Sequence, residues 1–302
     1  MSKITVLQYG IIFFAGMGTA TIANSLFFQK SQRKSAAGFF LGMVLVATIA
    51  AYSYVLEPNW IEVTKVKIKD SDLARSLAGV KIVQLSDIHL TNGINFREKE
   101  MIKKVNGLDP DFIFLTGDYF DDMSQVGSIV ALLKQLKARK GIWGVPGNTD
   151  HIAADHAETI SQVLESAGVR VLVNQGVRLA TGTGFFWLVG VDENVYHHDQ
   201  LFSALYGVPR NEPRILLAHS PAIIDEAARE EINLVLSGHT HGGQVGIPVL
   251  IKLSEYANRT HYMKGLFTKG KTKLYVNRGI GMKTLPIRFL CRPEITLFEV
   301  VS

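Results

Sequence analysis

The stretch K-I-V-Q-L-S-D-I-H-L, residues 81–90, joins a short apolar run to two groups that can bind a cation. Its apolar half, I-V-Q-L, is typical of a buried strand. Because Asp87 and His89 are two residues apart, at a strand end they project to the same side and could share one cation. An isolated Asp-x-His is usually a pair of solvated loop residues, so the interpretation depends on the rest of the chain.

Four further apolar runs end in polar residues of the same kind. They are residues 112–115 before T-G-D, 141–145 before P-G-N-T-D-H, 214–218 before H-S-P, and 233–236 before S-G-H-T-H-G-G. Alternation of such strands with helical patterns indicates an α/β fold, in which ligands gather at the carboxyl ends of strands. The oxygen and nitrogen donors at these five ends predict one shared metal site formed by Asp87, His89, Asp118, Asn148, His219, His239 and His241.

Hydrophobic periodicity predicts the remaining elements. Further strands are expected at 60–68, 169–173, 184–191, 272–276 and 295–301, and helices at 97–106, 129–138, 157–167 and 222–229. Residues 70–78 are interpreted as a polar connection. Residues 265–272 fit the P-loop pattern G-x-x-x-x-G-K-[ST], but a strand follows them where a P-loop requires a helix, so we expect a hairpin turn.

The first 57 residues differ in composition from the rest. Two stretches without Asp, Glu, Lys or Arg, 4–28 and 36–56, are each long enough to cross a bilayer, and residues 29–35 between them are basic. We therefore predict a transmembrane helical hairpin at 1–57 and a catalytic domain at 58–302, in a protein integral to the cell inner (plasma) membrane. A secretory signal and a buried pair of core helices remain alternatives for this segment.

Charge bears on partners and on orientation. Residues 1–57 carry four basic side chains and one acidic one, so they account for most of the net charge of +5, and no stable nucleic-acid partner is expected. The basic turn predicts that the domain lies on the outer side of the membrane, whereas Lys65, Lys67 and Lys69 favour the opposite orientation. The side of the membrane therefore stays open. A single cysteine, Cys291, excludes a disulfide within the chain and is expected to be structural.

The motifs D-I-H, G-D-Y-F-D, G-N-T-D, an isolated His and G-H-T-H occur in the order found in the calcineurin-like metallophosphoesterase superfamily, which the chain resembles from residue 81 onward. The resemblance implies a four-layer α/β/β/α sandwich with two mixed sheets. It also implies two divalent cations bridged by Asp118. One cation would be held by Asp87, His89, Asp118 and His241. The other would be held by Asp118, Asn148, His219 and His239, and Asp121 would be a supporting residue.

Two cations about 3.5–4 Å apart suit phosphoester hydrolysis because they generate hydroxide near neutral pH and neutralise the phosphoryl oxygens. Donors without thiolate suit Mn, Fe, Zn, Ni or Mg and do not choose among them. The family usually has His where this chain has Thr149, so the expected acid is missing. His151 is the candidate to replace it, and an exposed loop histidine is the alternative. A leaving group that needs little protonation is therefore favoured, as in a diester or a pyrophosphate.

The C-terminal phrases L-Y-V-N-R-G (274–279) and C-R-P-E-I-T (291–296) look like the bacterial branch with membrane-associated phosphodiesterases, which is similar to UDP-2,3-diacylglucosamine pyrophosphatases. The resemblance implies a phosphodiester or pyrophosphate bond in a membrane-associated or lipid-linked substrate, with the phospholipid membrane as a partner. Two alternatives remain open: a phosphodiesterase acting on soluble or nucleic-acid substrates, and a metal-binding scaffold with impaired catalysis.

Overall fold

The structure is a computed structural model that describes residues 32–154, 156–193 and 195–302. The chain divides into two compact units, which meet in sequence at Leu56 and Glu57. In the first unit, helix α2 (Gln32–Ala51) continues into the π-helical turn η1 (Tyr52–Leu56). Residues Gly38–Asn59 are long and apolar enough to cross a membrane. The other predicted membrane segment, residues 4–28, lies outside the described residues, so the hairpin stays a prediction.

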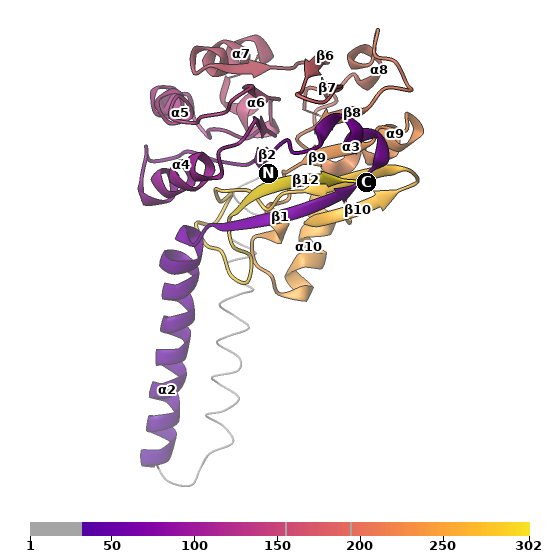
Figure 1. Ribbon diagram of the computed structural model, residues 1–302. Coiled ribbons are helices and arrows are strands. Elements are labelled where there is room, and N and C mark those ends of the chain that lie inside the picture. The colour runs from indigo at the N-terminus through magenta and orange to yellow at the C-terminus, as the bar shows by residue number, and fades with distance from the viewer. Residues whose placement is uncertain (1–31, 155, 194) are drawn as a thin grey trace. The chain divides into compact units, whose positions relative to one another are not determined.

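The second unit contains two six-stranded mixed sheets (Figure 1). The first has the order β1-β12-β2-β3-β4-β5 and the second β10-β11-β9-β8-β7-β6. The first sheet comprises β1 (Glu62–Lys69), β12 (Glu294–Val301), β2 (Ile82–Leu85), β3 (Phe112–Leu115), β4 (Gly141–Gly144) and β5 (Val169–Val171). The second comprises β10 (Gly265–Lys269), β11 (Thr272–Val276), β9 (Leu234–Ser237), β8 (Arg214–Leu217), β7 (Phe185–Gly190) and β6 (Gln175–Ala180).

Three apolar clusters separate four layers. Alternate residues of β2 and β3 pack outward against α4 (Phe96–Leu108), α5 (Val126–Leu133) and α7 (Ala157–Ser166). The intervening residues, such as Phe112 and Phe114, face the second sheet and pack against its inner face. The outer face of the second sheet is covered by α8 (Leu201–Ala204) and α9 (Ile224–Arg229). This arrangement confirms the predicted α/β/β/α sandwich, and it explains why the central strands are apolar throughout: both of their faces are buried.

Several elements differ from the sequence-based expectations. Residues 70–78 were expected to be a polar connection, which is wrong: they contain α3 (Ser71–Leu77), capped by the Asp70 carboxylate and anchored by buried Leu73 and Leu77.

Residues 265–272 form the β10–β11 hairpin, as expected. Strands β6 and β10 and the helices α6 (Asn148–Ala154) and α10 (Pro248–Asn258) were not predicted. These helices are short or lack a buried apolar stripe, and such a stripe is the signal that periodicity detects.

Candidate metal centre

Every predicted metal ligand lies just beyond the carboxyl end of a strand. Asp87 and His89 follow β2, Asp118 follows β3, and Asn148 begins α6 after β4. From the second sheet, His219 follows β8, while His239 and His241 follow β9. Their interatomic distances show that these strand ends of both sheets meet at one place.

The first group surrounds His89. Its Nε2 lies 3.2 Å from Asp118 Oδ2 and 3.1 Å from His241 Nε2. His241 Nε2 in turn lies 3.5 Å from Asp87 Oδ1. On the other side of the ring, His89 Nδ1 donates to the Asp121 carboxylate at 2.6 Å, which turns Nε2 toward the group. Asp121 therefore holds the imidazole in place, the supporting position expected from the sequence.

The second group surrounds His219. Its Nε2 lies 3.0 Å from Asn148 Oδ1, 3.1 Å from His239 Nδ1 and 3.4 Å from Asp118 Oδ2. Its Nδ1 donates to the carbonyl oxygen of Thr116 at 2.7 Å and so fixes the orientation of the ring. Asp118 Oδ2 thus lies between His89 of the first group and His219 of the second.

The two histidine–histidine contacts fit a cation. At 3.1 Å, two imidazole nitrogens need either a shared proton or a shared cation, because two lone pairs repel each other. Furthermore, His241 Nδ1 is buried without a hydrogen-bond partner in the described chain. The side chains present therefore suit divalent metal ions, although metal ligation by these seven residues stays a prediction.

The backbone at the centre is strained. Asp87, His89, Asp118, His239 and His241 all have positive φ, between 43° and 70°. Residues other than glycine rarely adopt this region, and such outliers cluster at functional sites, where tertiary contacts hold them. Two close approaches contribute here: a Cβ at Gly279 would lie 2.7 Å from Asp87 Cβ, and one at Gly238 would lie 2.3 Å from Asp87 Oδ2.

The electrostatics of the groups are asymmetric. Burial opposes protonation of His89 and His219, but the neighbouring carboxylates, Asp118 above all, raise their pKa to about 9 and about 10. Burial, together with the positive charge of His219, lowers the pKa of His239 to about 3, and burial holds the pKa of His241 well below its usual value. Each histidine pair therefore has one member that binds a proton tightly and one that stays neutral, and a bound cation would replace that proton.

Asp150, the last residue of the G-N-T-D motif, organises the loops around Asp118. One carboxylate oxygen accepts the N–H groups of Asp118 and Gly147, both at 2.9 Å, and the other accepts the Tyr119 N–H at 2.8 Å. The side chain is fully buried. The motif includes this residue, but no sequence pattern indicates that its side chain joins the loops after β3 and β4.

Replacing Asp150 with alanine is expected to lower the free energy of unfolding by about 3 kcal/mol, because buried N–H groups would lose their partner. Urea unfolding of the detergent-solubilised protein, followed by tryptophan fluorescence, measures the loss. Asp122→Ala is the matched control: its carboxylate caps the exposed turn η3 (Met123–Gln125), so its loss should lower the free energy of unfolding much less. Equal losses for the two variants would contradict the role assigned to Asp150.

Arg288 supports the loop behind Asp87 and could not be found from the sequence. It is fully buried, and its guanidinium donates to the carbonyl oxygens of Arg278, Gly279, Gly281 and Cys291. Cys291 is buried beside it, with Sγ 3.3 Å from the carbonyl oxygen of His241, which agrees with a structural cysteine. An isolated arginine carries no sequence signal for such a role, because its partners are backbone groups.

Thr149 and His151 occupy different surroundings. Thr149 donates its N–H to Asp118 Oδ1 and its hydroxyl to Asp118 Oδ2, both at 2.8 Å. These two hydrogen bonds fix the orientation of the carboxylate. His151 Nε2 lies 2.7 Å from Asp192 Oδ1, in a second cluster with His198. No hydrogen bond in the described chain joins His151 to the predicted ligands, so its part as a proton donor stays a prediction.

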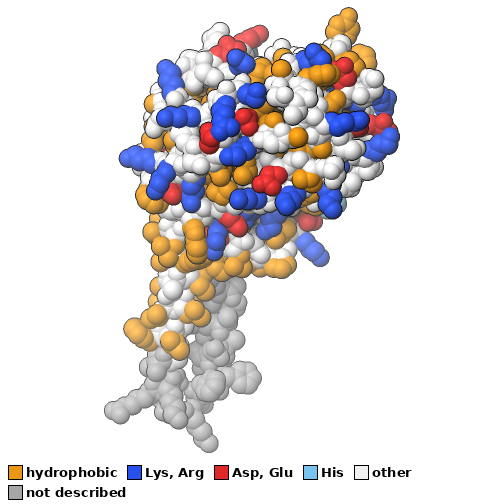
Figure 2. Space-filling view, viewed as in Figure 1, with side chains coloured by type: hydrophobic (Ala, Val, Ile, Leu, Met, Phe, Trp, Pro, Cys, Tyr) orange, Lys and Arg blue, Asp and Glu red, His pale blue; other side chains and the backbone are white. Residues whose placement is uncertain are grey.

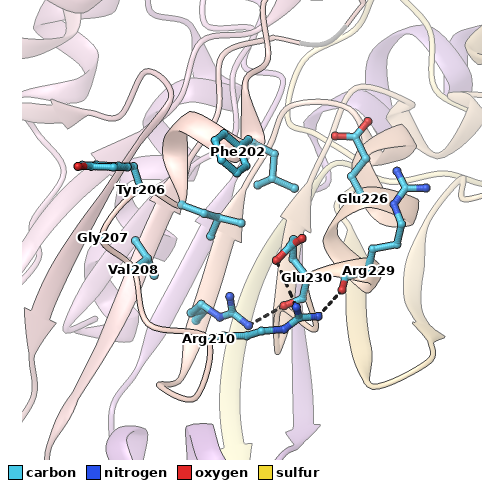
Figure 3. A pocket seen from close by; sticks show the side chains of 11 residues that line it. Phe202, Tyr206, Gly207, Val208, Arg210, Glu226, Arg229 and Glu230 are labelled. Atoms are coloured by element: carbon cyan, nitrogen blue, oxygen red, sulfur yellow. Dashed lines mark hydrogen bonds and ion pairs between the residues drawn. The ribbon is translucent and has the colours of Figure 1, made fainter.

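A separate pocket of about 490 Å³ lies between α8 and α9 (Figure 3). It is lined by apolar residues of α8 and of the segment after it, and by arginine and glutamate residues: Arg210 donates to the Arg229 carbonyl oxygen and lies 3.9 Å from the Glu230 carboxylate. None of the predicted metal ligands lines it. The pocket is therefore distinct from the candidate metal centre.

Comparison with known proteins agrees with this geometry. Residues 80–243 match the profile of the family described as calcineurin-like phosphoesterase. The metallophosphoesterase YkuE of Bacillus subtilis is 32% identical over 91% of this chain and 99% of its own length. The phosphodiesterase YaeI of Escherichia coli is 30% identical over 85% of this chain and 95% of its own length. A Bos taurus transmembrane protein with a metallophosphoesterase domain is 36% identical over 78% of this chain, which spans 56% of that protein. On these matches and on the sandwich described above, the chain belongs to the calcineurin-like phosphoesterase family and is a metallophosphoesterase.

Proposed function

We propose that the chain is a membrane-tethered phosphohydrolase that uses two divalent cations to cleave a phosphodiester or pyrophosphate bond in a membrane-associated or lipid-linked substrate. The observation that carries the proposal is the position of Asp118 Oδ2 between His89 Nε2 at 3.2 Å and His219 Nε2 at 3.4 Å. A carboxylate oxygen between two sets of donors is the arrangement that a bridging ligand needs.

The proposed cations divide the donors as the two groups do. Asp87, His89 and His241 would complete one site with Asp118, and Asn148, His219 and His239 the other. Such a pair would supply hydroxide and neutralise charge on the phosphoryl oxygens. The chain's own residues hold this arrangement: Asp121 and the Thr116 carbonyl orient the imidazoles, and Thr149 orients the bridging carboxylate.

Thr149 also bears on the leaving group. Its side chain donates to Asp118 and carries no proton of suitable acidity, so departure of the leaving group should depend on that group's own pKa. We expect the rate to fall steeply as the leaving-group pKa rises across a series of aryl and alkyl phosphodiesters. Thr149→His should supply a general acid and raise the rate for the alkyl phosphodiesters by about tenfold or more, because general-acid catalysis is worth about 10²–10⁴-fold. The dependence of rate on leaving-group pKa would then be shallower.

His151→Gln tests the alternative donor in the same assay. If His151 protonates the leaving group, this variant should steepen the dependence, and the wild-type protein should already show a shallow one. A shallow wild-type dependence that neither variant changes would contradict the assignment made for Thr149.

Two observations support a membrane-bound substrate. The stretch Gly38–Asn59 is apolar enough to cross a membrane, and the Bos taurus relative is described as a transmembrane protein. A membrane tether suits an amphipathic substrate that stays in the bilayer. UDP-2,3-diacylglucosamine is the specific candidate, and the proposed location is the cell inner membrane. Mass spectrometry of lipids and nucleotide-linked lipids after depletion of the protein tests it: accumulation of the candidate supports it, and an unchanged level rejects it.

A metal-binding scaffold is the second candidate, and the absence of the usual histidine at Thr149 favours it. Incubation with bis-p-nitrophenyl phosphate and Mn²⁺ separates the two functions. Turnover that disappears in Asp118→Ala would eliminate the scaffold. Cleavage of added single-stranded DNA at a comparable rate would instead point to a nucleic-acid phosphodiesterase.

A further inference from the structure

Helix α10 presents its apolar side to the surroundings. None of its residues is buried. Its outward face carries Val249, Leu253 and Tyr256, spaced four and three residues apart, with 63%, 42% and 88% of their surfaces exposed. The side toward the domain is only partly exposed and carries Leu250 and Ile251 together with Ser254 and Asn258, which hydrogen-bond to each other. A surface helix normally turns a polar face to the solvent, so the exposed apolar row calls for an apolar partner.

Leu290 lies near the start of α10, and Trp60 contacts Arg292, two residues further along the same loop. Leu290 is 62% exposed, and the residue before it accepts the Gly246 N–H at 2.7 Å, two residues before α10 begins. Trp60 is 53% exposed, and its ring stacks on the Arg292 guanidinium, 3.5 Å from the ring centre. Tryptophan and arginine side by side are typical of the headgroup level of a bilayer.

Leu290 is also tied to the apolar stretch that could cross a membrane. The Glu57 carboxylate accepts the N–H groups of Leu290 and Cys291 at 2.9 and 2.5 Å. Glu57 is itself buried and lies near the end of the stretch Gly38–Asn59. The hydrogen bonds therefore join the residue at which the second unit begins to the loop beside α10.

The same helix is coupled to the metal centre. It begins five residues after the turn η5 (His241–Gly243), which carries a predicted ligand. A Cβ at Gly243 would lie 3.4 Å from Ile251 of α10, so helix and turn are packed together. Whatever binds α10 is therefore held next to the metal-binding turn.

We propose that Val249, Leu253 and Tyr256 of α10, together with Leu290 and Trp60, form a docking surface that lies in the headgroup layer of a phospholipid bilayer. This inference rests on the membrane-bound phosphohydrolase proposed above and adds how its substrate reaches the site. Docking places the turn η5 against the lipid headgroups, so a lipid-linked phosphate enters the metal centre from the bilayer surface. Figure 2 shows hydrophobic side chains gathered along the lower edge of the 57–302 unit, where Figure 1 places α10.

A bilayer fits this surface better than a second copy of the chain. An 11-residue helix is about 16 Å long, and one such helix with two flanking side chains offers less than the roughly 800 Å² per partner of a stable protein interface. The outward side of α10 carries Lys252 and no acidic residue, which suits anionic lipids. A protein partner would need a surface of complementary shape, which this row of separated side chains does not offer. A lipid surface has no such requirement.

The direct test places a fluorescent label on α10 in the full-length protein. Tyr256→Cys is labelled with a polarity-sensitive dye and incorporated into nanodiscs of phosphatidylcholine and phosphatidylglycerol, with and without lipids carrying a nitroxide quencher. We expect a blue-shifted emission that the quencher reduces at least twofold. Phe202→Cys on α8, whose side chain is 91% exposed, is the matched control and should stay unquenched. Wild-type protein measures any labelling of buried Cys291.

A second measurement connects docking to substrate access. Leu253→Glu places a charge on the surface without touching a predicted ligand, and should raise KM about tenfold for a phosphodiester embedded in vesicles while leaving kcat/KM for soluble bis-p-nitrophenyl phosphate unchanged. Phe202→Glu should change neither value. Equal quenching at positions 256 and 202 would overturn the docking surface, as would crosslinking of α10 between two copies without lipid quenching. Normal quenching in a protein that hydrolyses neither ester would instead overturn the proposed function and leave the surface in place.

Discussion

Replacing Asp118 with alanine is expected to lower kcat for hydrolysis of bis-p-nitrophenyl phosphate by about 10³-fold or more. One oxygen of its carboxylate lies 3.2 Å from His89 Nε2 and 3.4 Å from His219 Nε2, so its loss affects both proposed cation sites at once. Each cation contributes several kcal/mol of charge stabilisation in the transition state, and every 1.36 kcal/mol corresponds to a factor of ten in rate. Steady-state kinetics in saturating Mn²⁺, together with metal analysis of the purified variant, measures both effects.

Asp72→Ala is the control for this substitution, because the Asp72 side chain is 56% exposed and, among the described residues, forms an ion pair only with Arg75 on α3. It should leave kcat and metal content unchanged. A folded Asp118→Ala protein that keeps more than about a tenth of the wild-type rate would contradict a bridging role for Asp118.

Removal of metal by a chelator is expected to abolish turnover completely, and the affinity for added Mn²⁺ should rise with pH. In the metal-free protein, carboxylates keep protons on His89 and His219 up to about pH 9 and about pH 10, despite burial. A cation must displace these protons, so each displaced proton strengthens apparent binding by about tenfold per pH unit below those values. Calorimetric titrations at pH 6.5, 7.5 and 8.5, in buffers with different ionisation enthalpies, measure the affinity and the proton release.

His261→Ala is a suitable control because the His261 side chain is 93% exposed and should not change metal affinity or its pH dependence. His219→Ala should remove the proton release associated with one group. Binding that is equally strong at all three pH values, with no proton release, would show that the raised pKa values do not oppose the metal.

The convergence of the candidate metal ligands could be predicted because these residues directly follow strand ends in the sequence. Each predicted ligand follows an apolar run within a few positions, and strands buried on both faces leave a strong hydrophobic signal. The family motifs supplied the order of the ligands. The role of Asp150 and the residue Arg288 were missed because their partners are backbone groups, and backbone groups have no residue-type signature.

The sequence by itself determined the α/β class, the central strands and which oxygen and nitrogen donors terminate them, because burial on both faces and strand-end placement are properties of short segments. Only the tertiary structure decided that Asp118 Oδ2 lies between His89 and His219, and that Thr149 donates a hydrogen bond to the same carboxylate. It also decided that the apolar row of α10 faces outward. These features arise from the packing of two sheets brought together from distant parts of the chain, and the sequence separation of 152 residues between His89 and His241 leaves no local pattern that could specify their 3.1 Å contact.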